Sequence, residues 1–231
     1  MFIGDSTMMQ AGAAVINAVH WDNLERHGVD RLGNRLHRGC QEQLSFGQSD
    51  TLIGVGLGRA NRGRTWVELA NRTHATGASA RPDIVVVSAG PHVYLLPDFD
   101  LMLDRVVEEH RALFPEVKLV WKTQPGVGCG LSPLKAPPDA AFWGAGGPSY
   151  NHALFPAFDA AAHTLFAHPA AARDTRFLLD VSPLALRVDS HPGSRGAIES
   201  RGTRDCLHSC PGPLDHLVPR NLLHLLLHHG L

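Results

Sequence analysis

The sequence lacks several features that would assign a protein to a class at once. No run of apolar residues is long enough for a transmembrane helix, and no signal peptide is recognisable ahead of Phe2. The formal net charge is −1 over 231 residues, so there is no electrostatic reason to expect nucleic acid as a partner. There is no internal repeat, and the glycine-rich segment 54–58 completes neither a Walker loop nor a GxGxxG loop, which argues against a phosphate site.

Cysteine is scarce as well, with four residues at Cys40, Cys129, Cys206 and Cys210. An even count is compatible with two disulfides in a secretory compartment, in any of three connectivities, or with free buried thiols. We expect disulfides. The Cys206-x-x-x-Cys210 spacing has no second pair to match it, so a zinc site is not indicated.

What the sequence does contain is the composition of an ordinary globular protein, with 44% hydrophobic and 19% charged residues, rather than that of a disordered one. Its length fits a single domain, 1–231, with a substantial core. The clearest strand is the β-branched run 84–87, which is typical of a parallel strand buried on both faces. We expect further strands at 1–3, 51–53, 117–121 and 177–181, and helices at 7–27, 100–114, 150–168 and 217–229.

The alternation of strands and helices predicts an α/β fold, a three-layer α/β/α sandwich with a mainly parallel central sheet. Ligands of such sheets bind beyond the carboxyl ends of the strands. Ser6, the segments 88–92 and 123–126, and the chain after Val181 all lie at that edge. The Gly- and Pro-rich stretch 126–149 is long for a connection and is expected to form a lid or wall. This convergence is the main reason to expect an enzyme.

The turn Gly4-Asp5-Ser6 ends the first hydrophobic strand and leads into an apolar, helix-compatible stretch. A serine at a strand-to-helix turn is exposed beside free helix N–H groups, which suits a nucleophile. The alternative is that Ser6 only caps the helix, which is the commoner role of such a serine. Only residues 1–3 precede the turn, whereas strands usually run about five or six residues. We therefore expect a truncated first strand in a piece of a longer protein, in which an upstream membrane anchor is possible.

A serine nucleophile needs a base within hydrogen-bond reach, and the base needs an acceptor that orients it. Asp205 and His208 supply both, and their i,i+3 spacing can place them on the same side of one turn. An Asp-x-x-His spacing also arises by chance as a surface pair. Together with Ser6 it defines the chain order Ser…Asp…His, which we take as the predicted catalytic set.

Five blocks of the sequence together resemble one hydrolase family. They are 2–7 (FIGDST), 85–92 (VVVSAGPH), 120–129 (VWKTQPGVGC), 179–192 (LDVSPLALRVDSHP) and 205–215 (DCLHSCPGPLD). In order and spacing the chain resembles the PC-esterase branch of the SGNH (GDSL) hydrolase superfamily, which includes trichome-birefringence-like and capsule O-acetyltransferases. The resemblance spans nearly the whole chain. The last block is specific, whereas Gly-Asp-Ser alone is not.

The resemblance implies that Ser6 is the nucleophile, His208 the general base and Asp205 the residue that orients the base. Such enzymes pass an acyl group through a serine ester to water or to a sugar hydroxyl. We therefore expect an acyl esterase or O-acyltransferase that acts on O-acetyl groups of a carbohydrate. No metal or cofactor is implied, although a transferase would use an acyl donor such as acetyl-CoA or an acetylated intermediate. The expected compartment is the secretory pathway, either the Golgi lumen or the extracellular space.

The resemblance also indicates which groups would bind the oxyanion, and where the chain departs from the family. Ser88 stands where the superfamily usually has asparagine, Gly90 lies in the same block, and we take Gly56 from the glycines of 54–58. Met9 replaces an arginine that is frequent in acyltransferases, and Val127 replaces a histidine. These departures favour, as the alternative, a catalytically weakened or inactive SGNH-fold domain that binds carbohydrate or another partner.

Histidine is unusually frequent, at 15 residues, and we interpret most of it as compositional bias. Asp189 and His191 are interpreted as braces of the active-site loop, and His92 as a loop histidine. His224 and His228 are spaced i,i+4 but lack an accompanying carboxylate, so no metal site is expected. Three aromatic residues flank the long loop and are equally compatible with sugar stacking and with core packing: Trp121, Trp143 and Tyr150.

Overall fold

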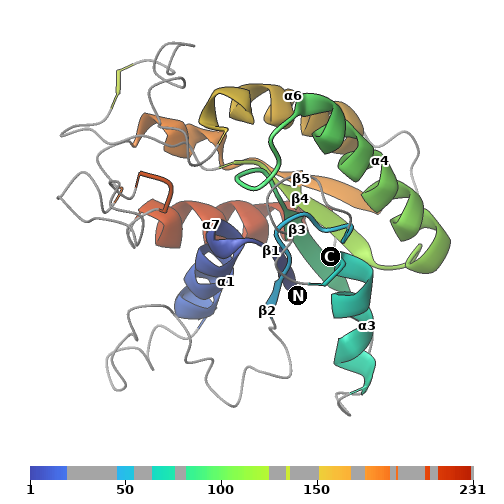
Figure 1. Ribbon diagram of the computed structural model, residues 1–231. Coiled ribbons are helices and arrows are strands. Elements are labelled where there is room, and N and C mark those ends of the chain that lie inside the picture. Colours follow the sequence, from blue (N-terminus) through green and yellow to red (C-terminus); the bar gives the residue numbers. More distant parts are fainter. Residues whose placement is uncertain are drawn as a thin grey trace.

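The computed structural model describes residues 1–19, 46–54, 64–75, 82–124, 134–135, 151–167, 175–187, 191, 206–208 and 213–229. Within these ranges the chain forms a central sheet that is covered by helices on both faces (Figure 1). The predicted α/β sandwich is therefore confirmed.

The sheet has five strands in the order β2-β1-β3-β4-β5, and every neighbouring pair is parallel. The strands are β1 Phe2–Gly4, β2 Phe46–Gln48, β3 Ile84–Ser88, β4 Lys118–Lys122 and β5 Arg176–Leu179. The strands predicted at 84–87, 117–121 and 177–181 are confirmed, apart from small shifts at their ends. β1 is short but pairs on both edges, because Phe2 is in register with Phe46 on one side and with Val86 on the other.

Side chains of successive strand residues alternate between two cores, as the period of a strand requires. The helices are α1 Ser6–Val19, α3 Trp66–Ala75, α4 Leu96–Leu113, α6 Phe155–Phe166 and α7 Pro213–His228. Phe2 and Val86 belong to the core under α1 and α7, whereas Ile3 and Val87 belong to the core under α3, α4 and α6 (Figure 1). A sheet buried on both faces explains why 84–87 is apolar at every position rather than at alternate ones.

Trp121 on β4 is a core residue with no exposed area. Its ring meets Phe99 of α4 edge-on at a centroid distance of 5.7 Å and lies 5.6 Å from Phe166 of α6. Of the two alternatives left open for Trp121, core packing is therefore confirmed and sugar stacking is excluded. Trp143 and Tyr150 lie outside the described residues.

The strand predicted at 51–53 is also wrong, because the chain turns there. The Ser49 N–H donates to the Gly4 carbonyl at 2.8 Å, and the Ser49 hydroxyl then accepts the Leu52 N–H at 3.0 Å. Leu52 has a φ of 58° and Gly54 a φ of 68°, so neither has extended backbone. Thr51 and Leu52 are nevertheless buried. The apolar pattern thus reports burial of a turn, and the strand lies earlier, at Phe46–Gln48.

The helices differ from expectation mainly at their ends. α1 extends to Val19 within the described residues, α4 begins at Leu96, and α7 begins at Pro213 rather than at 217. The helix predicted at 150–168 is a short 3₁₀ helix, His152–Leu154, followed by α6. α3 has no counterpart among the predicted helices. None of the described helices combines the length and the apolar character that a membrane span requires.

Candidate active site

The sheet order places Ser6 at the point where the chain reverses its direction of winding. β1 has β2 on one side and β3 on the other, so the loops that leave β1 and β3 diverge at the carboxyl edge. Ligands of open parallel sheets bind at such a point. Ser6 directly follows β1, and Ser88 is the last residue of β3. The fold therefore brings the predicted nucleophile and the predicted oxyanion segment to one edge.

Asp5, not Ser6, caps helix α1. One carboxylate oxygen of Asp5 accepts the Thr7 N–H at 2.8 Å and the Thr7 hydroxyl at 2.7 Å. The Asp5 carbonyl accepts the N–H groups of Met8 and Met9 at 3.1 and 3.2 Å. Ser6 is thus the first helical residue, and its hydroxyl is not used as the cap. This removes the main alternative to a nucleophilic role for Ser6.

Gly4 makes the tight approach of β1 to β3 possible. A Cβ atom at this position would lie 2.4 Å from the Ser88 carbonyl oxygen and 2.8 Å from the Met8 Cβ. Any larger residue would therefore push β1 away from β3 or tilt the start of α1. The glycine of the Gly-Asp-Ser turn is required by packing, and this packing determines where Ser6 lies.

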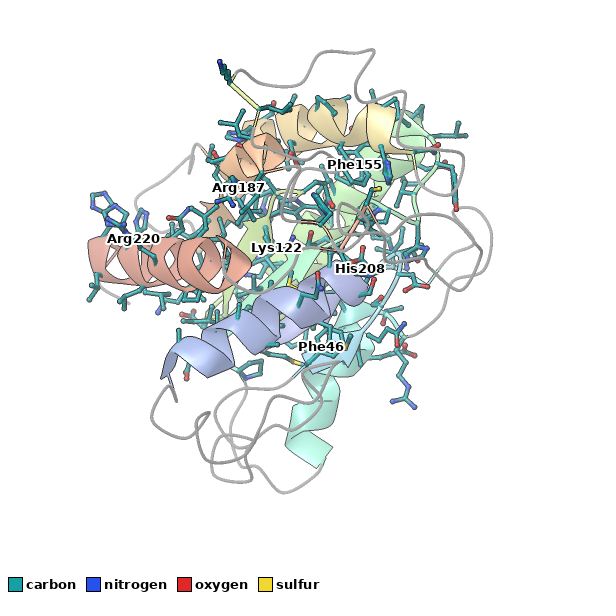
Figure 2. The ribbon with its side chains drawn as sticks, turned by 90° about the vertical axis from the view of Figure 1, so that its left-hand side faces the viewer. Phe46, Lys122, Phe155, Arg187, His208 and Arg220 are labelled. Atoms are coloured by element: carbon teal, nitrogen blue, oxygen red, sulfur yellow. The ribbon has the colours of Figure 1, made fainter. Side chains whose placement is uncertain are left out.

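His208 brings a base to the serine from the far end of the chain. Its Nε2 atom lies 2.7 Å from the Ser6 Oγ, although the two residues are 202 positions apart. Both side chains are half-buried, and Leu207 beside the histidine is buried in the core. Figure 2 shows His208 beside one end of α1. This contact has the distance and the atom types of a serine nucleophile with its general base.

Two of the predicted site residues, Asp205 and Gly56, lie outside the described residues, as do Val127 and Asp189. Met9, at the position of the family's arginine, lies on α1 one turn after the nucleophile. Cys206 is disulfide-bonded, and the other three cysteines lie outside the described residues.

Ser88 and Gly90 lie against Gln124, a residue that the sequence did not single out. Gln124 follows β4, and its side-chain amide donates to the Ser88 Oγ at 3.3 Å and to the Ala89 carbonyl at 2.8 Å. A Cβ on Gly90 would lie 2.7 Å from the Gln124 amide carbon. Ser88 has no exposed area, so its hydroxyl lies beneath the surface of the site. The only sequence signal for Gln124 is its place just after a strand at the carboxyl edge.

A group of buried charges lies below the Ser6 turn. Lys122 at the end of β4 is 1% exposed, and Asp5 has no exposed area. Burial lowers the pKa of Lys122 to about 8, against the opposing attraction of Asp5 and Asp159. Burial likewise raises the pKa of Asp159 to about 7, although the Gln124 N–H and Lys122 favour its charged form. Perturbed ionisable groups of this kind concentrate at functional sites.

Two further histidines lie near the His208 segment. His191 is 1% exposed, and its Nδ1 atom lies 2.7 Å from the His208 carbonyl oxygen. This contact agrees with the interpretation of His191 as a brace of the active-site loop. His152 is also buried, and burial together with the charge of His191 lowers the pKa of His152 to about 4.

Three other histidines have defined neighbours. His92 lies 3.9 Å from an Asp50 carboxylate oxygen, so the loops after β2 and β3 meet. The rings of His224 and His228 stack on α7 at a centroid distance of 6.0 Å. Among the described residues, no group of three or more histidine, cysteine or acidic side chains is arranged to hold a metal ion.

Comparison with known proteins does not assign the chain to a family. No protein-family model matches the sequence, and no curated protein matches it.

Proposed function

We propose that the protein is a serine-dependent acyl esterase or O-acyltransferase that acts on O-acetyl groups of a carbohydrate. The observation that carries the proposal is the 2.7 Å contact between the Ser6 Oγ and the His208 Nε2. Its position at the carboxyl edge of a parallel sheet, beside the start of α1, supports a catalytic rather than a structural pair.

The chemistry follows from these two side chains. As the Ser6 Oγ attacks the acyl carbon and forms a C–O bond, its proton passes to the His208 Nε2. The tetrahedral intermediate then expels the alcohol, which takes that proton as its own C–O bond breaks. In the second half, His208 removes a proton from water or from a sugar hydroxyl, and that oxygen attacks the acyl-serine. The proton returns to Ser6 when the product ester or acid leaves.

The start of α1 supplies an environment that favours the negative charge of the intermediate. The N-terminus of a helix carries partial positive charge, and Ser6 is the first residue of the helix. Ser88, Gly90 and Gly56 remain the proposed oxyanion or substrate-binding residues, and Asp205 remains the proposed partner of His208. The carbohydrate substrate, the acyl donor and the secretory or extracellular compartment rest on the family resemblance.

The test is the hydrolysis of p-nitrophenyl acetate and the labelling of the protein by a fluorophosphonate probe. Ser6→Ala should abolish labelling and lower turnover by more than about 10³-fold, and His208→Gln should slow both reactions strongly. Thr164→Ala is a matched control, since this hydroxyl bonds within its own helix α6 to the Ala160 carbonyl. Labelling of Ser6→Ala at the wild-type rate would contradict the proposal.

The second candidate is an inactive SGNH-fold domain that binds carbohydrate or another partner. The observation that favours it is the complete burial of Ser88, whose hydroxyl accepts from Gln124. The loss of one oxyanion donor costs about 10²–10³ in rate. A wild-type protein that binds an acetylated glycan in calorimetry but resists the fluorophosphonate probe would favour this candidate.

A further inference from the structure

We infer that His191 is a positioning residue for the proposed acyl-transfer reaction, one that holds the backbone of His208 so that its imidazole reaches Ser6. The inference rests on the proposed function and adds a residue to it. His191 does not touch the nucleophile in the described contacts, and it acts through the base.

The hydrogen bond has only one possible direction. The His191 Nδ1 atom lies 2.7 Å from the His208 carbonyl oxygen, and a carbonyl can only accept. Nδ1 must therefore carry a proton and donate, in the neutral and in the charged form of the ring. The distance is short for an N–H···O bond, and His191 is 1% exposed, so water does not compete for the donor.

Besides its contact with Ser6, the His208 segment is held by the burial of Leu207, by the hydrogen bond from His191 and by the disulfide of Cys206. Leu207 is 1% exposed and packs in the core under α3, α4 and α6, which anchors one side of the segment. His191 binds the carbonyl of the next residue. A backbone position fixed on both sides leaves the His208 side chain little freedom, and its Nε2 then lies 2.7 Å from the Ser6 Oγ.

Removing the donor at residue 191 should therefore change the position of the His208 imidazole relative to the Ser6 Oγ. The His208 carbonyl would lose its partner in a partly buried place, and the backbone would shift to find another. A misplacement of about 1 Å at a catalytic group costs about 100-fold in rate. Because the bond acts on the base, we expect the loss to appear in kcat rather than in KM.

Three substitutions of His191 separate the donor from the ring. In His191→Asn the side-chain nitrogen lies close to where Nδ1 was, so the bond to the His208 carbonyl can form again. His191→Gln carries the same amide one methylene further out, and His191→Leu has no donor. We expect Leu and Gln to lower kcat and the fluorophosphonate labelling rate by about 10- to 100-fold, with little change in KM, and Asn to restore most of both.

His110→Leu is the matched control. His110 is also buried, and its Nε2 donates to the Val117 carbonyl at 2.7 Å. This bond lies at the amino end of β4, whereas Ser6 lies at the carboxyl edge of the sheet. The substitution should lower thermal stability without changing kcat of the folded protein. If His191→Leu does not fold, the comparison of Asn with Gln decides the inference.

Each outcome has one meaning. Wild-type kcat in His191→Leu or His191→Gln, with Ser6→Ala inactive, overturns the inference and leaves the proposed function standing. Equal loss in the Asn and Gln variants also overturns it, since the ring rather than the donor would then matter. A wild-type protein as inert as Ser6→Ala overturns the proposed function and, with it, the inference.

Discussion

Acidification should destabilise the folded protein through His152. This side chain is 3% exposed and packs edge-on against Phe155 at a centroid distance of 5.5 Å. Burial, and to a lesser degree the charge of His191, lowers the pKa of His152 from 6.5 to about 4. As the pH falls from 6.5 to 4, His152 becomes protonated in the unfolded chain but stays neutral in the folded protein. The contribution of His152 to the free energy of unfolding must therefore decrease across this window.

The size of the effect follows from the two pKa values. The interval from 6.5 to about 4 corresponds to a maximum of about 3.4 kcal/mol, reached below pH 4. At pH 5 the loss relative to pH 7 is about 2 kcal/mol, which is a large part of the stability of a typical domain. Well above pH 6.5 the ring is neutral in both states and contributes no pH dependence.

Urea unfolding at pH 7 and pH 5, for the wild type and for His152→Phe, isolates the contribution of His152 to the pH dependence of the free energy of unfolding. Phenylalanine keeps an aromatic ring against Phe155 but cannot bind a proton. Asp159, with its pKa raised to about 7, acts in the opposite direction, since the folded protein takes up its proton first as the pH falls. That contribution is common to both proteins and cancels in the difference. The wild type should lose about 2 kcal/mol more than the variant, and equal losses would refute the reasoning.

Two further predictions concern the serine turn. Gly4→Ala should lower the free energy of unfolding by about 3 kcal/mol, because the new Cβ would lie 2.4 Å from the Ser88 carbonyl oxygen. Gly12→Ala, whose Cβ would lie 3.3 Å from the Phe2 ring, should stay within about 1 kcal/mol of the wild type in the same urea titration. Asp5→Ala removes the cap of α1 and should cost about 1–2 kcal/mol and slow fluorophosphonate labelling, and Asp5→Asn, which keeps the acceptor, should lie between it and the wild type. Labelling of Asp5→Ala at the wild-type rate would show that the cap does not hold the nucleophile.

Several elements of the fold were predictable because their signals are local. A run of β-branched residues at 84–87 is sufficient to indicate a strand buried on both faces, and the structure has β3 there. The segment 51–53 shows the limit of this reasoning. Its side chains are buried as an apolar run predicts, yet Leu52 has a φ of 58°, and bonds from Ser49 bend the chain. Burial and backbone conformation are separate properties, and an apolar run reports only the first.

Trp121 shows the same limit for a candidate binding residue. Its place beside the glycine-rich loop was equally compatible with an exposed sugar platform and with the core. The choice depended on which face of β4 it occupies, and Phe99 and Phe166 cover that face. The neighbours come from α4 and α6, which no local pattern around Trp121 identifies.

Local patterns were enough to indicate the available chemistry: a serine after a short strand, a histidine at position 208, and strands that must form a buried parallel sheet. The contacts between these parts became visible only in the folded chain. There, Asp5 rather than Ser6 caps α1, the His208 ring lies 2.7 Å from the Ser6 Oγ across 202 positions, and His191 binds the carbonyl of His208. Residue types and their periods are local, whereas a hydrogen bond between distant segments depends on how the packing of the whole sheet and its helices places their backbones.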